Sequence, residues 1–204
     1  MRRWHLLVGV IVISATLWFV FSKPKTSTER AMNHYSEDLM DLSRKYKVPW
    51  KYLMALTVLE CSGEKPCSSR FEKHVFVQLQ QLRDGKKKRY GTVKRSDIDD
   101  ANDDALKNLA SSWGPFQIMG YHCIQSEVSI AQLRSDEGLE HAVRWINTNY
   151  GDRLRKQEFQ DSFHIHNTGK PFPKSGSPTT HDPQYVFRGI SLMEEFENMR
   201  KKKQ

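Results

Sequence analysis

Hydrophobic and polar positions along this chain follow the spacing of amphipathic helices far more often than the alternation of strands. Apolar residues recur three and four positions apart in the stretches 33–47, 70–82, 136–149 and 185–200, which places them on one face of a helix. Within the second stretch, the run 75–77 suits a strand equally well. No internal repeat is visible, so the sequence predicts a mainly α-helical single domain.

The most informative stretch is 48–63, which reads VPWKYLMALTVLECSG. Pro49 can open a helix, because the first helical residue needs no N–H partner. Gly63 can end the helix in a left-handed cap. Between them, leucines recur at helical spacing and predict one apolar stripe, at positions 53, 56 and 59.

Glu60 would lie in the last turn of this helix, which is an unfavourable place for a carboxylate. It would meet the negative end of the helix dipole, and apolar surroundings disfavour its charged form. A general acid needs such surroundings, because it must hold a proton near neutral pH. The alternative is an exposed glutamate that is harmless in water, and the stripe alone leaves both interpretations open.

The apolar run 4–21 is 18 residues long and contains no Asp, Glu, Lys or Arg, which is just enough to span a bilayer as a helix. A cleaved signal peptide is the alternative, but no small-x-small cleavage site follows the run. Arg2 and Arg3 precede it and favour a cytoplasmic N-terminus, with the folded domain outside the cytoplasm. The expected organisation is an anchor or signal segment, a linker, one domain and a basic tail, at 1–22, 23–32, 33–200 and 201–204.

The formal net charge of +8 suits an anionic polymer or a membrane surface as a partner. Basic and aromatic residues are not interleaved, so nucleic-acid binding is not expected. The acidic run 97–104 resembles a calcium loop only loosely, because Ala105 and Ser111 stand where that pattern needs Gly and Glu. No metal or cofactor is therefore expected.

The chain has three cysteines, Cys61, Cys67 and Cys123, which would meet an oxidising environment if the domain is exported. Cys61 could pair with Cys67 across a short loop, or it could pair with Cys123. One thiol is left over in either case, and the spacing does not choose between the two pairs.

Two later segments carry polar residues in apolar or proline-rich settings. Gln117 lies in SSWGPFQIMG, residues 111–120, where a buried amide must find hydrogen-bond partners. The stretch 163–180 is rich in proline and is expected to be a long ordered loop. It carries three further candidate site residues, His164, His166 and Asn167.

Taken together, these segments resemble the lytic transglycosylases of the lysozyme-like superfamily. SRKYKVPWKYLMALTVLECSG resembles their first motif, a helix ending in Glu-Ser-Gly, although Cys61 is inserted here after Glu60. SSWGPFQIMG resembles the second motif, and IHNTG followed by QYVFRGISLMEEF resembles the closing Tyr-Asn-x-Gly and Tyr-Val elements. FEKHVF and SSWGPFQIMG also resemble the bacterial and phage N-acetylmuramidase family. The resemblance spans about residues 40–200 and implies a lysozyme-like domain of the goose-type lysozyme and transglycosylase kind.

The resemblance implies a role for each residue that matches a motif. Glu60 becomes the general acid and then the base. His166 stands where the transglycosylases have a tyrosine that positions the catalytic carboxylate, and it could do the same through a ring N–H. With His166, the residues implied to contact or shape the glycan site are Ser62, Gln117, Asn167 and Tyr185.

The resemblance also implies cleavage of the β-1,4 bond between N-acetylmuramic acid and N-acetylglucosamine in peptidoglycan. The enzyme would sit in a bacterial inner membrane with its domain in the periplasm. A lytic transglycosylase would need Glu60 alone, whereas a hydrolytic muramidase needs a second carboxylate such as Glu72. Two further alternatives are a zinc-dependent peptidoglycan endopeptidase that uses His164 and His166 and a glycan-binding module without activity.

Overall fold

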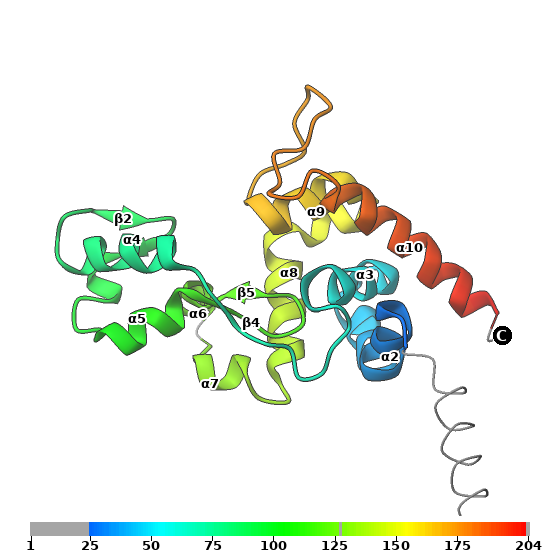
Figure 1. Ribbon diagram of the computed structural model, residues 1–204, viewed down its shortest axis with the longest axis horizontal. Coiled ribbons are helices and arrows are strands. Elements are labelled where there is room, and N and C mark those ends of the chain that lie inside the picture. Colours follow the sequence, from blue (N-terminus) through cyan, green and yellow to red (C-terminus); the bar gives the residue numbers. More distant parts are fainter. Residues whose placement is uncertain (1–24, 127, 203–204) are drawn as a thin grey trace, which may run out of the picture.

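The computed structural model of this chain describes residues 25–126 and 128–202, and the expected anchor at 4–21 lies outside them. Figure 1 shows a larger and a smaller group of elements, with the long helix α8 (Gly138–Arg155) between them. Among the described residues, no helix is both long enough and apolar enough to cross a membrane. The domain is mainly helical, as the sequence predicts.

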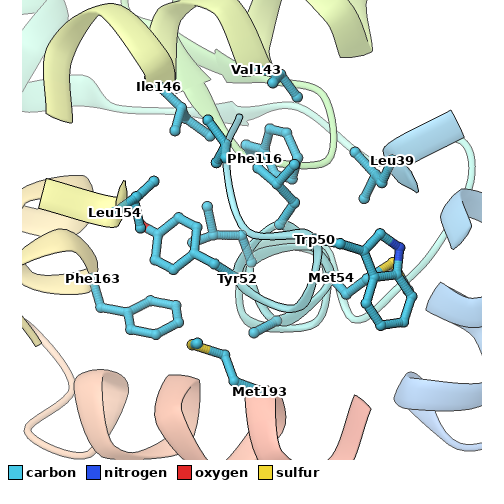
Figure 2. Close-up of a cluster of buried hydrophobic side chains, with 14 of the residues drawn as sticks. Leu39, Trp50, Tyr52, Met54, Phe116, Val143, Ile146, Leu154, Phe163 and Met193 are labelled. Atoms are coloured by element: carbon cyan, nitrogen blue, oxygen red, sulfur yellow. The ribbon is translucent and has the colours of Figure 1, made fainter. Parts of the chain in front are cut away.

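The larger group is built around α3 (Trp50–Cys61), which is buried on all sides. Every residue from 52 to 57 is buried, so the expected single stripe at 53, 56 and 59 was too narrow a description. Figure 2 shows the side chains of Trp50, Tyr52 and Met54 leaving α3 in different directions, each into the core. The helices packed around α3 are α2 (Ser27–Tyr46), α8, α9 (Phe159–Thr168) and α10 (Tyr185–Lys201).

The smaller group has its own hydrophobic core, formed by Val75, Leu79, Leu82, Val93, Ile98, Leu106 and Ala110. Its main helices are α4 (Lys73–Arg83) and α5 (Asp103–Leu109), so the run 75–77 is helical. A hairpin of β2 (Arg89–Tyr90) and β3 (Val93–Lys94) leads into η1 (Arg95–Asp97).

A small antiparallel sheet links the two groups in the order β1 (Arg70–Phe71), β4 (Ser111–Trp113), β5 (Ile118–Met119). Three short helices then lead from the sheet toward α8. They are η2 (Gly120–His122), α6 (Cys123–Ser126) and α7 (Ile130–Leu133).

Two expectations about element boundaries were wrong. Helix α2 begins at Ser27 and not near residue 33, because Thr26 and Glu29 form a capping box in which each side chain accepts the other's backbone N–H. The linker expected at 23–32 therefore ends earlier. Residues 163–168 are the C-terminal half of α9 and not a loop.

Helix α10 packs closely on α9 because Gly189 has no side chain. A Cβ atom at this position would lie 2.7 Å from the ring of Phe163, closer than real contacts allow. One turn earlier on α10, Tyr185 packs against the same ring, with the two ring centres 6.5 Å apart. The close approach therefore fixes how deeply Tyr185 reaches into the core.

Candidate functional site

The end of α3, which carries Glu60, is fastened to the start of α2. Arg30 donates hydrogen bonds from Nε and Nη2 to the carbonyl of Ser62, at 3.2 and 3.0 Å. Gly63 has a φ of +70°, and a Cβ there would lie 2.5 Å from the carbonyl oxygen of Ser27. Ser62 is the left-handed C-cap and Gly63 continues in the same conformation, so the expected left-handed end of the helix is confirmed one residue earlier than predicted.

Tyr185 holds the carboxylate of Glu60 by donating a hydrogen bond to Oε1. Burial, and then the neighbouring Glu60, raise the pKa of Tyr185 well above its ordinary value, so its hydroxyl remains a donor. The Glu60 side chain is 17% exposed. The structure thus brings Glu60 and Tyr185 together and leaves the Glu60 side chain partly exposed.

His166 lies beside the same oxygen but does not hydrogen-bond to it. Its Nε2 is 3.8 Å from Glu60 Oε1 and donates instead to the carbonyl of Phe116, at 2.9 Å. Burial lowers the pKa of His166, and this effect outweighs the attraction of Glu60. The imidazole is therefore neutral, and the expected direct hydrogen bond from its N–H to Glu60 is replaced by the one from Tyr185.

Two tyrosines that sequence analysis missed complete this network. The Nδ1 atom of His166 is 2.6 Å from the hydroxyl of Tyr150, and Tyr52 donates to that same hydroxyl at 3.3 Å. Tyr150 lies at a kink inside α8, where its φ of −151° and ψ of 20° are not helical. Both tyrosines are buried, and in the sequence they resemble ordinary core residues.

Gln117 lies in the turn between β4 and β5 with a φ of +46°. Its Nε2 donates to the carbonyls of Ser68 and Gly114, both at 3.0 Å, and its Oε1 accepts from the hydroxyl of Ser112 at 2.6 Å. These bonds hold the turn against the segment that follows the cysteine loop. Gln117 is therefore close to the His166 partner Phe116, but its amide is engaged within the protein.

The other residues that the resemblance implied lie at the edge of this network. Ser62 and Asn167 are both exposed, two residues after Glu60 and one after His166. Glu72 makes contacts of its own, because its Oε1 accepts from Arg70 at 2.6 Å and its Oε2 is 3.6 Å from His74 Nδ1.

His164 does not form a site with His166. Its Nε2 accepts the backbone N–H of Thr179 at 3.0 Å, and its Nδ1 lies 2.6 Å from the carbonyl of Lys170. Both ring nitrogens thus hold the loop between α9 and α10. In residues 25–126 and 128–202, no three side chains of His, Cys, Asp or Glu are grouped to bind a metal.

Cys61 and Cys67 lie together at the end of α3. Both thiols donate to the carbonyl of Glu64, at 3.5 and 3.1 Å. The adjacent Cys61 thiol lowers the pKa of Cys67, burial opposes this, and the hydroxyl of Tyr35 lowers the pKa further. Cys123 lies elsewhere, in α6, among residues of the β5 and α8 region.

No protein-family model and no curated protein matches the chain. One solved structure, the crystal structure of Burkholderia AP3 phage endolysin, is similar to 81% of this chain over 71% of its own length, with a TM-score of 0.53 and 19% sequence identity. The chain has the fold of that endolysin. The likeness does not separate a transglycosylase from a muramidase.

Proposed function

We propose that this protein cleaves peptidoglycan at the β-1,4 bond between N-acetylmuramic acid and N-acetylglucosamine, with Glu60 as general acid and then general base. The observation that carries the proposal is the setting of Glu60. It ends a buried helix, remains partly exposed, and is held at one oxygen by the hydroxyl of Tyr185. The endolysin fold supports a substrate of this class.

We favour the lytic transglycosylase route, because it needs one carboxyl group only. Glu60 would donate its proton to the glycosidic oxygen as the bond from that oxygen to C1 breaks. The N-acetyl group of the muramic residue can assist at C1 meanwhile. Glu60 would then accept the proton of the sugar's own 6-hydroxyl as O6 bonds to C1. The product is a 1,6-anhydro end, and Glu60 is restored to its starting state.

A hydrolytic muramidase is the alternative, and it needs a second carboxyl group near the scissile bond. In the described part of the chain, the side chains within hydrogen-bond or ion-pair distance of the Glu60 carboxylate are Tyr185 and His166. Glu72, which accepts from Arg70 and lies beside His74, is the first candidate for the second carboxyl group.

The test is Glu60→Gln in the full-length protein, acting on purified peptidoglycan. General acid–base catalysis is worth about 10²–10⁴-fold, so cleavage should nearly vanish while the melting temperature stays at or slightly above that of the wild type. Glu195→Gln, on the exposed side of α10, is the matched control and should be fully active. Full activity of Glu60→Gln would refute the proposal.

The wild-type products decide between the two routes. Mass spectrometry should find muropeptides with 1,6-anhydro ends, which are one water lighter than those of a hydrolase. Reducing ends would keep the role of Glu60 and make the protein a muramidase, with Glu72→Gln as the next variant to measure.

The proposed location follows from the expected anchor. Residues 4–21 would hold the protein in a bacterial inner membrane, with the domain in the periplasm facing the peptidoglycan. The surplus of positive charge, +8 over the whole chain, suits the anionic cell wall as a partner.

A further inference from the structure

Only one assignment of donors and acceptors is consistent with the hydrogen bonds around His166. The carbonyl of Phe116 can only accept, so the proton of His166 is on Nε2. Because the ring is neutral, Nδ1 carries a lone pair and must accept from Tyr150. The single proton of the Tyr150 hydroxyl is then used, which leaves it free to accept from Tyr52. The series of hydrogen bonds runs from Tyr52 through Tyr150 and His166 to the Phe116 carbonyl.

The titratable groups around His166 all favour its neutral form except one. Burial raises the pKa of Tyr150 well above its ordinary value, so this hydroxyl stays a donor. His122, close to the same indole of Trp145 that borders His166, has a pKa lowered to about 4 by burial and then by His166 itself. Glu60, and after it the hydrogen bond to the Phe116 carbonyl, raise the pKa of His166, and burial outweighs both.

We propose that Tyr150 is a positioning residue for Glu60. By donating to Nδ1 of His166 while the Phe116 carbonyl accepts from Nε2, it holds the ring at both nitrogens and keeps the Nε2–H beside Glu60 Oε1. This inference rests on the proposed function, since it assigns Tyr150 a task only if Glu60 is the general acid.

The fixed tautomer serves both halves of the proposed reaction. A charged imidazole 3.8 Å from Glu60 would attract the carboxylate form, which is the wrong form for a group that must first give a proton. The neutral Nε2–H ring avoids this. Once Glu60 has given its proton, the same N–H dipole lies 3.8 Å from the new carboxylate and stabilises its charge electrostatically. The alternative tautomer would present a lone pair to both oxygens and would repel them.

The first measurement is the tautomer itself, by long-range ¹H–¹⁵N spectra of the full chain labelled in histidine. The signal of His166 is assigned from its loss in His166→Gln. We expect the proton on Nε2 in the wild type, and an Nδ1 signal shifted by the hydrogen bond from Tyr150. In Tyr150→Phe the proton should stay on Nε2, because the Phe116 carbonyl still accepts it, and the Nδ1 signal should move to the position of a free lone pair. A proton on Nδ1 in the wild type, or an Nδ1 signal that does not move in Tyr150→Phe, would overturn the proposal. The wild-type spectrum can therefore overturn it even if Tyr150→Phe fails to fold.

The second measurement is kinetic, on soluble uncrosslinked glycan strands. Losing one neutral hydrogen bond should lower the kcat of Tyr150→Phe about 3- to 10-fold, with KM unchanged because Tyr150 is buried and its hydroxyl is bonded within the protein. Tyr46→Phe is the matched control, since Tyr46 donates to Glu140 on another surface, and it should keep wild-type kcat.

A double-mutant cycle separates positioning from general loss of packing. His166→Gln keeps an N–H donor at the Nε2 position and removes the ring acceptor at Nδ1. If Tyr150 acts through His166, adding Tyr150→Phe to His166→Gln should cause no further loss of kcat, whereas a full additional loss would contradict the proposal.

The inference and the function it rests on can fail separately. Wild-type kcat in Tyr150→Phe together with an inactive Glu60→Gln would overturn the positioning role alone. A fully active Glu60→Gln would overturn the function and with it the role of Tyr150, while the tautomer measured by NMR would stand as a structural result.

Discussion

Cys61 and Cys67 should form a disulfide when the domain is exported, and Cys123 should stay a free thiol. Both sulfur atoms of the proposed pair point at the same carbonyl oxygen of Glu64, and the lowered pKa of Cys67 makes it the better attacking thiolate. Joining two thiols in a disulfide releases two electrons. A disulfide-bearing protein outside the cytoplasm, or oxidised glutathione, would accept them. The thiolate of Cys67 forms the mixed disulfide, and Cys61 then attacks it and releases the reduced acceptor.

The size of the effect follows from the length of the loop. A bond from Cys61 to Cys67 closes seven residues, for which the chain-entropy relation gives about 2.4 kcal/mol at 25 °C. In a domain of this size, 1 kcal/mol shifts the melting temperature by about 2–4 °C, so the expected loss on reduction is about 5–10 °C.

The assay is thermal unfolding with and without reductant, together with counting of free thiols. The oxidised wild type, counted after unfolding because Cys123 is buried, should have one free thiol and should lose stability on reduction. Cys67→Ser should unfold at the lower temperature under both conditions, while Cys123→Ser, the control, should keep the full response to reductant. Three free thiols in protein recovered from an oxidising compartment, or a response that disappears in Cys123→Ser, would show that the pairing is wrong.

Three further outcomes are expected. Gln117→Ala should lower the melting temperature as well as the activity, because three hydrogen bonds are lost; unchanged stability with lost activity would instead support direct contact of Gln117 with the substrate. Tyr185→Phe removes a hydrogen bond to a carboxylate, worth about 1.5–3 kcal/mol, so kcat should fall roughly tenfold to hundredfold in a folded protein, and a wild-type kcat would count against the role of Tyr185. Residues 4–21 should remain attached in the membrane fraction, and N-terminal sequencing of a mature chain that starts beyond Phe21 would contradict the anchor.

The local part of the structure could be predicted because its determinants are local. Pro49 and the residues after Glu60 mark both ends of α3, and the apolar run between them predicts a helix. The start of α2 was missed because a capping box in a polar stretch, Thr26 with Glu29, was not recognised. The prolines that follow residues 163–168 dominate the composition of the stretch and predict a loop, although helix α9 ends before the first proline.

The site was predictable only where a motif contained its residues. Glu60, His166 and Tyr185 lie in segments that resemble family motifs, and the structure brings these three side chains together. Tyr52 and Tyr150 lie 98 residues apart in the sequence, and a buried tyrosine in a helix normally indicates packing. Only the kink in α8 and the crossing of α3 turn them into partners of His166.

The hydrogen bond between Glu60 and Tyr185 has a consequence for the order in which the protein is made. The two residues are separated by 125 positions, and α3, which carries the acid, leaves the ribosome long before α10. Until α10 docks, with Gly189 against Phe163, the carboxylate has no donor to hold it. A chain that is still being synthesised, or one that has lost α10 to a protease, would therefore have Glu60 without the Tyr185 hydroxyl that holds its carboxylate. Under the proposed function, full peptidoglycan-cleaving activity would appear only after α10 has docked.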